Sequence, residues 1–122
     1  ISNDIGSYMQ VKRIEDMVGG WFVGNFDPSV LRTHDFEVGY KFHPKGEKWD
    51  VHYHKRSIEI TYLIRGKMMI QGRELTSGDI FTIFPYEVAN PVFLEDCEVV
   101  IIKTPSVVGD KYNVPTEPGG EA

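Results

Sequence analysis

The sequence predicts an all-β protein, built either as a sandwich or as a barrel. Short segments of strand character recur about every ten residues and are separated by turns that contain glycine. No stretch keeps a helical apolar period for more than a few turns. At 122 residues the chain is expected to form one domain. The strand pattern alone leaves sandwich and barrel open.

The first part of the chain has the weakest pattern. Residues 9–17 alternate weakly and predict a strand or an arm, which the glycine pair 19–20 ends. Residues 21–26 are rich in aromatic side chains and predict a short strand. Asp27 as N-cap and Pro28 at the first helical position predict a single helical turn after it.

From residue 36 onward, the pattern predicts a series of strands. Residues 36–43 alternate cleanly, with Phe36, Val38, Tyr40 and Phe42 on one face, as in a half-buried strand. Further strands are expected at 49–54, 58–65, 68–70, 74–75, 80–84, 91–94 and 98–103.

Three potential metal ligands lie close together between Gly46 and Gly66. Side chains in a strand change face at every residue, so His52 and His54 share one face, about 7 Å apart along the strand. Glu59 follows His54 at a distance that lets the chain turn and return on a neighbouring strand. Two imidazoles and a carboxylate suit a divalent first-row metal, and such sites usually keep positions open for substrate.

This stretch also resembles a known family. Its spacing, Gly-x5-His-x-His-x4-Glu-x6-Gly, matches the first motif of the cupin superfamily at every fixed position. The resemblance covers residues 36–104 and is to small single-domain cupins. It implies a double-stranded β-helix, or jelly-roll barrel, with the motif lining the interior. It also implies that His52, His54 and Glu59 bind a divalent transition metal, namely Fe, Mn, Ni, Zn or Co.

The second cupin motif, Gly-x5-Pro-x-Gly-x2-His-x3-Asn, is poorly matched after Gly78. Tyr86 stands where the motif has its second glycine, and Ala89 stands where the family has its fourth metal ligand. Three protein ligands plus water suffice in many catalytic sites, so the first motif still predicts a metal, weakly held. In a regular strand Glu87, unlike Asn90, would share a face with Ala89 and replace the lost donor.

Six further residues are candidate contacts of the cavity or its substrate: Thr61, Leu63, Tyr86, Glu87, Ala89 and His43. Thr61 and Leu63 share the face of Glu59 and are expected to line the cavity. Tyr86 is expected either to narrow the cavity mouth or to pack. His43 is expected to support the site, to contact substrate, or to lie at the surface.

Two other interpretations of the motif compete with a metal site. Two histidines on a strand can simply face solvent beside a surface glutamate, although the flanking glycines favour a ligand set. The site can also be a relic, in which the fold was kept and the metal was lost, as the alanine at position 89 would allow.

Composition narrows the class of protein. The formal net charge of −5 argues against binding of nucleic acid or an anionic membrane, and the apolar runs are too short to span one. With a single cysteine, Cys97, the chain forms no internal disulfide, which predicts a reducing cytoplasm. Residues 1–35 are expected to form an arm that helps dimerisation, 36–114 the barrel, and 115–122 a flexible tail.

The predicted function is metal binding by His52, His54 and Glu59, and a reaction on a small polar substrate that is carbohydrate-like or bears a carboxylate. The alternatives are a non-catalytic binding module or sensor with weak or no metal, and a purely structural component. The sequence does not decide whether the protein is an enzyme. A homodimer is expected from the resemblance and from the aromatic residues 21–26.

Overall fold

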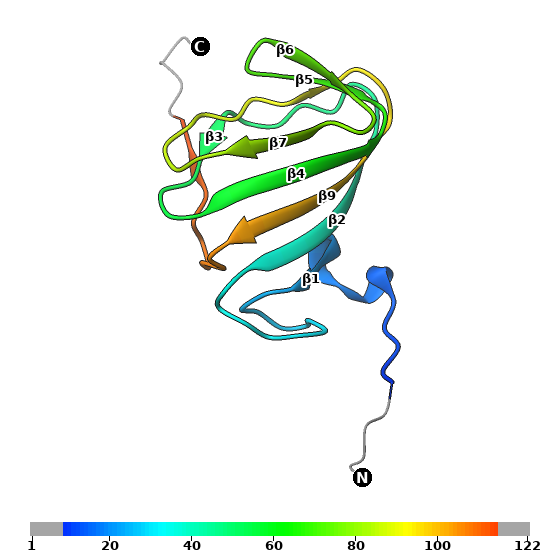
Figure 1. The fold of residues 1–122 in the computed structure, drawn as a ribbon, viewed down its shortest axis with the longest axis vertical. Helices are drawn as coiled ribbons and strands as arrows, with labels where there is room; N and C mark the ends of the chain where they lie inside the picture. The colour runs from blue at the N-terminus through cyan, green and yellow to red at the C-terminus, as the bar shows by residue number, and fades with distance from the viewer. Residues whose placement is uncertain (1–8, 115–122) are drawn as a thin grey trace.

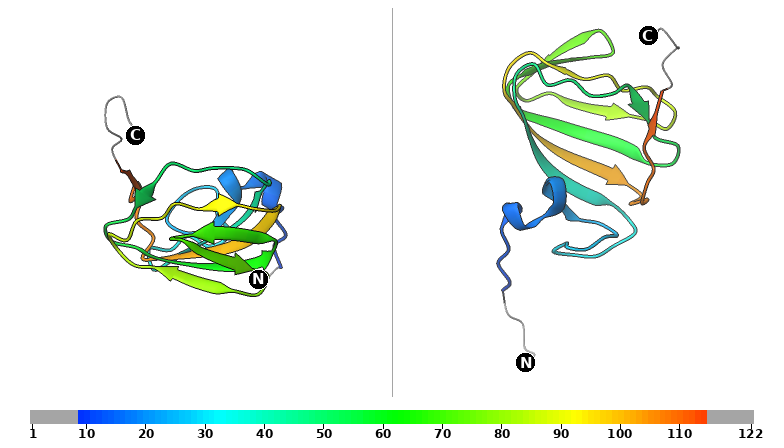
Figure 2. Two further views of the ribbon diagram at one scale, coloured as in Figure 1. Left: turned by 90° about the horizontal axis from the view of Figure 1, so that it is seen from above. Right: turned by 180° about the vertical axis from the view of Figure 1, so that it is seen from behind.

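The fold is known from a computed structural model, which describes residues 9–114. Two antiparallel sheets face each other across a common interior, and a two-stranded ribbon lies at one edge of this barrel (Figures 1 and 2). The five-stranded sheet has the order β1-β2-β9-β4-β7, the three-stranded sheet β6-β5-β8, and the ribbon β10-β3. The expected all-β class is confirmed.

The described chain forms two short 3-10 turns and ten strands. Two short 3-10 turns precede the strands, at Ile14–Asp16 (η1) and Val18–Gly20 (η2). The strands are β1 (Trp21–Val23), β2 (Glu37–His43), β3 (His52–Tyr53), β4 (Ile58–Arg65), β5 (Lys67–Ile70), β6 (Arg73–Thr76), β7 (Ile80–Ile83), β8 (Val92–Phe93), β9 (Cys97–Thr104) and β10 (Tyr112–Asn113).

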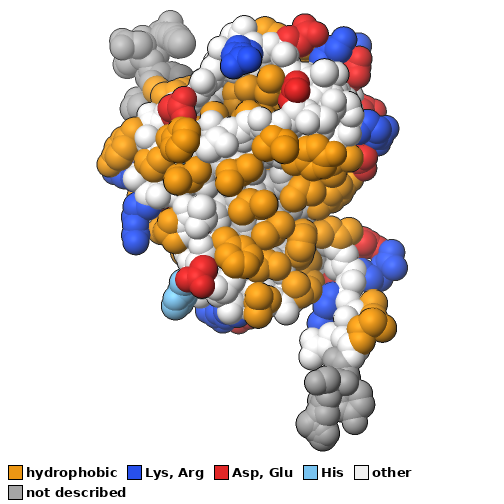
Figure 3. Space-filling view, in the orientation of Figure 1, with side chains coloured by type: hydrophobic (Ala, Val, Ile, Leu, Met, Phe, Trp, Pro, Cys, Tyr) orange, Lys and Arg blue, Asp and Glu red, His pale blue; other side chains and the backbone are white. Residues whose placement is uncertain are grey.

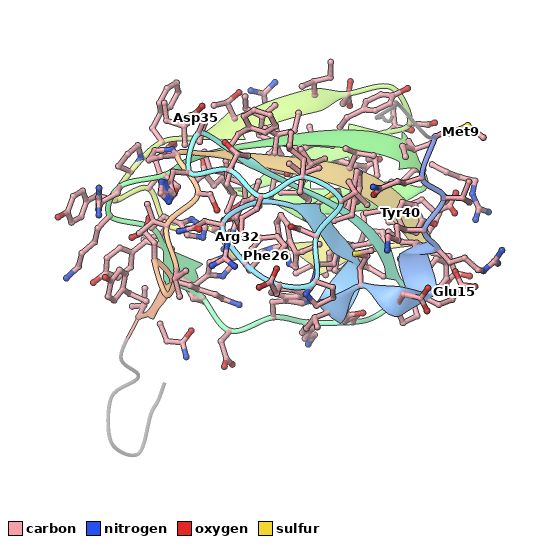
Figure 4. All side chains as sticks on the ribbon, turned by 90° about the horizontal axis from the view of Figure 1, so that it is seen from below. Met9, Glu15, Phe26, Arg32, Asp35 and Tyr40 are labelled. Carbon is pink, nitrogen blue, oxygen red and sulfur yellow. The ribbon has the colours of Figure 1, made fainter. Side chains whose placement is uncertain are left out.

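Two expected elements differ from the structure. The helical turn after Asp27 is wrong: the segment forms bends, because Leu31 pairs with Val23 and the Val30 amide donates to the Phe22 carbonyl. This pairing holds the loop between β1 and β2 across the lower end of the barrel (Figure 4). The strand at 49–54 is shortened to β3, since its partner β10 is only two residues long.

Strand β2 turns its more polar face inward. His43 is 5% exposed, whereas its neighbour Phe42 is 49% exposed. Tyr62 of β4 and Ile80 of β7 are exposed on the same outer side of the sheet. Apolar side chains therefore gather on the outer face of the five-stranded sheet (Figure 3).

The core lies between the two sheets. Leu63 and Val99 of the larger sheet pack with Met68 and Phe93 of the smaller one, each at most 4% exposed. Gly66 joins the sheets at φ 108°, where an added Cβ would lie 2.3 Å from the Asp96 carbonyl oxygen. The last glycine of the first motif is therefore required by close backbone approach.

The flexible tail expected at 115–122 lies outside the described residues. Across residues 9–114 no helix combines the length and apolar character that crossing a membrane would need.

Candidate metal centre

The backbone holds the His52 ring by one of its two nitrogens. The residue lies on β3 and is 6% exposed. Its Nδ1 lies 3.0 Å from the Asp50 carbonyl oxygen, so Nδ1 carries the proton and donates. The lone pair is then on Nε2. A backbone carbonyl that fixes the tautomer in this way is the usual support of a metal-binding histidine.

His54 is buried without hydrogen-bond partners for its ring. It is 2% exposed, and neither Nδ1 nor Nε2 has a partner within residues 9–114. Burial, the positive charge of Lys103 and the neighbouring His52 lower the pKa of His54 to about 4. The ring is therefore neutral near pH 7, which is the form that binds metals. Unpartnered buried polar atoms cost roughly 1–3 kcal/mol each, so this ring needs a ligand.

Glu59 brings a carboxylate to the same point. It lies at the start of β4, and its Oε1 is 3.6 Å from His54 Nδ1, too far for a hydrogen bond. One ligand atom from each of His52, His54 and Glu59 lies within 4.8 Å of the others. Ligand atoms that share one ion at about 2.1 Å lie roughly 3–4 Å apart, so a small inward shift of these side chains would bring all three onto one metal.

The segment between His54 and Glu59 is fixed by a carboxylate from far along the chain. Asp110 is 6% exposed and accepts the backbone amides of Lys55, Arg56 and Ser57 at 2.9–3.0 Å. Burial alone would raise the pKa of Asp110. The hydrogen bonds from the three amides lower the pKa by more, so the net shift is downward. Asp110 thus sets the path of the chain from one ligand to the next.

Replacing Asp110 by alanine is expected to lower the free energy of unfolding by about 3 kcal/mol or more, because three amides would lose a charged acceptor. Chemical denaturation measures this change. Asp79→Ala, which removes a carboxylate bonded to one exposed amide, should cost less.

The contribution of Asp110 should also depend on pH. Because its pKa is depressed, the stabilisation is fully present above about pH 4, the ordinary aspartate value. This stabilisation is lost as the pH falls through the depressed pKa that Asp110 has in the folded protein. Asp110→Asn should remove this acid-dependent loss, and equal acid sensitivity in both proteins would contradict it.

A small cavity of about 60 Å³ lies beside the cluster. His52, Glu59 and Thr61 line its polar side, and Thr61 Oγ1 is buried without a partner in the described chain. The rest of the wall is mostly apolar and includes Phe81 and Ala89. A metal held here would face a small, mostly apolar space.

His43 and Ala89 line this cavity too. His43 is not at the surface: its ring stacks on Phe93 at 4.2 Å between centroids, and its Nδ1 lies 3.1 Å from Glu47 Oε2. Ala89 pairs with His52, each amide bonding the other residue's carbonyl. Residues so paired project to the same face of a sheet.

Three other predicted contacts lie elsewhere. Leu63 points inward but is fully buried in the core. Glu87 accepts the Phe84 amide at 2.8 Å, because this stretch is a turn and not the regular strand assumed for it. Tyr86 is 66% exposed and stacks on Tyr53 at 6.0 Å, so it packs and does not narrow the cavity.

Sequence analysis missed two residues that shape the centre. Trp49 lines the cavity and donates its indole N–H to Glu47. Asp110 carries no local signal, since its contacts lie more than 50 residues away in sequence.

No protein-family model and no curated protein matches the chain. Solved structures do match. KdgF from Halomonas sp. is 26% identical, with a TM-score of 0.57 over 62% of this chain and 74% of that one. An uncharacterised conserved protein with a double-stranded β-helix domain, from Klebsiella pneumoniae, is 20% identical, with a TM-score of 0.64 over 86% and 91%.

A third similar structure contains a metal. The bacterial pirin YhhW from Escherichia coli, in complex with nickel(II), is 18% identical with a TM-score of 0.59. The match covers 71% of this chain but only 39% of the pirin. Together with the two facing antiparallel sheets and the motif inside them, these likenesses show that the chain is a cupin by fold, with the double-stranded β-helix that its first motif implied.

Proposed function

We propose that the protein binds one divalent transition metal through His52, His54 and Glu59 and acts on a small polar substrate beside it. The observation that carries the proposal is the ring of His54, which is buried and neutral with both nitrogens unpartnered in the described chain. A buried ring in this state is explained by a ligand that accepts its lone pair. The cupin fold and the nickel-bound pirin support the same proposal.

The residues around the cluster define what the site can do. A bound divalent ion supplies Lewis acidity toward an oxygen of the substrate. His52 is held in one tautomer by the Asp50 carbonyl, and the loop before Glu59 is held by Asp110. Thr61 offers a hydroxyl to a bound molecule, and the rest of the wall is mostly apolar. The site is therefore preorganised before a substrate arrives.

A binding module or sensor with the same cavity and little metal is the second candidate. The alanine at position 89 favours it, because its side chain offers no donor atom where the cupin motif has a fourth ligand. The preorganised histidines favour the metal instead.

Metal uptake tests the proposal. Metal-free protein without a histidine tag, titrated with Mn, Fe, Co, Ni and Zn, should take up one equivalent of at least one ion and melt at a higher temperature. Calorimetry and elemental analysis measure this. Absence of uptake for all five ions would leave the second candidate.

We also propose a homodimer in which a second copy covers the outer face of the five-stranded sheet. Phe42, Tyr62 and Ile80 are 49%, 43% and 66% exposed on this face. At the N-terminal segment, Met9 and Val11 are 89% and 76% exposed and would extend the interface as expected from the sequence. A cytoplasmic location and the absence of nucleic-acid binding remain predictions from the single cysteine and the net charge of −5.

Sedimentation at micromolar concentration should give twice the chain mass of 13.9 kDa. Tyr62→Glu should shift the protein to the monomer, because a charge would be buried in an apolar interface. Val108→Glu serves as the control, since Val108 is 77% exposed and lies away from this sheet face. A monomeric wild type would refute the dimer.

A further inference from the structure

The cavity beside the metal ligands is too small to hold a whole substrate. Its volume of about 60 Å³ equals roughly two water molecules at about 30 Å³ each. Sites that enclose small molecules usually measure about 300–1,000 Å³. The body of any substrate must therefore lie outside this cavity, with only one end of the molecule reaching in.

A larger groove of about 420 Å³ lies next to the cavity, between β6 and β7. It is lined by polar side chains such as Arg73 and Thr82. Three apolar side chains, Ile70, Phe81 and Ile83, line both the groove and the cavity. They form a partition that keeps the cavity small. Ile70 and Ile83 are buried in the core, whereas Phe81 is only partly buried and packs at its edge.

The hydroxyl of Thr61 lies on the cavity side of this partition. Thr61 is 3% exposed, and its Oγ1 has no hydrogen-bond partner within residues 9–114. Its cross-strand partners, Phe81 on β7 and Ile101 on β9, are both apolar and line the same cavity. Because buried hydroxyls in proteins are normally hydrogen-bonded, a molecule that enters the cavity is the natural partner of this one.

Thr61 stands at a definite distance from the metal ligands. Glu59 and Thr61 share the inner face of β4 and are separated by two residues, or about 7 Å along the strand. A ligand with two neighbouring oxygen atoms can offer one of them to the ion and the other to the Thr61 hydroxyl. A carboxylate has two such oxygens, and both accept hydrogen bonds.

The charge of the cavity wall also favours a carboxylate once a metal is bound. Among the described residues, Glu59 is the one carboxylate or ammonium side chain that lines the cavity. A divalent ion adds two positive charges, so ion and Glu59 together carry one positive charge, which one carboxylate balances. Groups of both signs surround the wall and do not decide the matter: Lys41, Lys103 and Lys111 against Glu37, Glu47 and Asp110.

We infer that the cavity takes the carboxylate end of an unbranched organic acid, held between the metal and the Thr61 hydroxyl, and that Phe81 excludes acids branched beside the carboxylate. This rests on the proposed function, because the metal supplies one of the two contacts. Thr61 binds the acid directly, and Phe81 sets the width of acid that can enter.

Two isomeric acids test the size limit. Pentanoate is unbranched, and pivalate carries three methyl groups on the carbon beside its carboxylate, with the same formula and charge. In calorimetric titrations of protein loaded with the ion that it takes up most tightly, pentanoate should bind about tenfold or more tightly than pivalate. It should exceed the uncharged pentan-1-ol by as much. Equal affinity for the two acids would overturn the inference.

Variants of Phe81 test whether this side chain sets the limit. Phe81→Ala joins the cavity to the groove and should bring the affinities for pentanoate and pivalate within about threefold of each other. Phe81→Leu should narrow the ratio less, and it keeps the test usable if the alanine variant does not fold. Phe84→Ala is the matched control, because Phe84 follows β7 directly but is 55% exposed and absent from the cavity wall. If Phe81→Leu and Phe84→Ala both keep the wild-type ratio, the role of Phe81 is wrong.

Variants of Thr61 test the hydrogen bond. Thr61→Val removes the hydroxyl at nearly constant shape and should weaken pentanoate binding about tenfold, and Thr61→Ser should restore most of it. Thr82→Val serves as the control, since Thr82 is exposed and lies outside the cavity wall. Without metal, Thr61→Val should melt no lower than the wild type, because it deletes an unpartnered buried hydroxyl. A clear drop would show that the hydroxyl has a partner in the fold, which would contradict its role toward the acid.

The metal titrations separate this inference from the proposed function. Metal uptake without a preference for pentanoate would overturn the inference and leave the metal centre standing. Absence of metal uptake would refute the metal centre and this inference with it. In metal-free protein neither acid should bind measurably, since Glu59 then repels a carboxylate; equal binding with and without metal would show that the ion does not hold the acid.

Discussion

Replacing His52 by alanine is expected to abolish metal uptake. His54 and Glu59 would remain, but two protein ligands compete poorly with solvent for a first-row ion. Losing a mere supporting contact commonly weakens metal sites about 10–100-fold, so loss of a ligand should exceed about a hundredfold. Calorimetric titration should show this loss, and the rise in melting temperature on adding metal should disappear with it.

Two other histidines provide controls for this experiment. His34 is exposed, and His34→Ala should bind metal as the wild type does. His43 lines the same cavity, but its ring is engaged by Glu47 and Phe93. His43→Ala should therefore retain the stoichiometry of one ion. If His52→Ala binds as tightly as these controls, the ligand set is wrong.

The local character of the first motif explains why sequence predicted this cluster. His52, His54 and Glu59 lie within eight residues of one another, so strand alternation and one turn suffice to bring them together. The support of the cluster is not local. Asp110 reaches the amides of Lys55 to Ser57 only after the chain has crossed the barrel several times.

Alternation likewise identified two faces of β2 without fixing their direction. The face of Phe42 is the more apolar one, which suggests burial, yet it points outward on the exposed sheet surface. The face of Lys41 and His43 points inward. Lys41 lies over a tryptophan ring there, and His43 lines the cavity beside the metal ligands. A pattern within one strand cannot reveal this, because the choice depends on which residues the opposite sheet presents.

The second motif is better matched in backbone than in sequence. Tyr86, at the place of the motif glycine, has φ 70°, a left-handed conformation that glycine adopts without cost. The backbone at this position is thus one that the glycine of the motif would adopt without strain. This agreement also supports the alignment that places Ala89 at the position of the fourth ligand.

Ala89→His is therefore expected to tighten metal binding by about tenfold or more. Ala89 pairs with His52 through two backbone hydrogen bonds of 2.7 and 3.1 Å, so a side chain at this position projects beside the His52 ring. It is 4% exposed and borders the cavity of about 60 Å³, into which an imidazole can extend.

Ala89→Leu is the matched control, since it fills the same space without a donor atom. It should leave metal affinity unchanged or lower it, and both variants should lose some stability through crowding. A fourth protein ligand also occupies a position on the ion that a substrate would otherwise use. Equal metal affinity of Ala89→His and Ala89→Leu would show that position 89 does not face the ion.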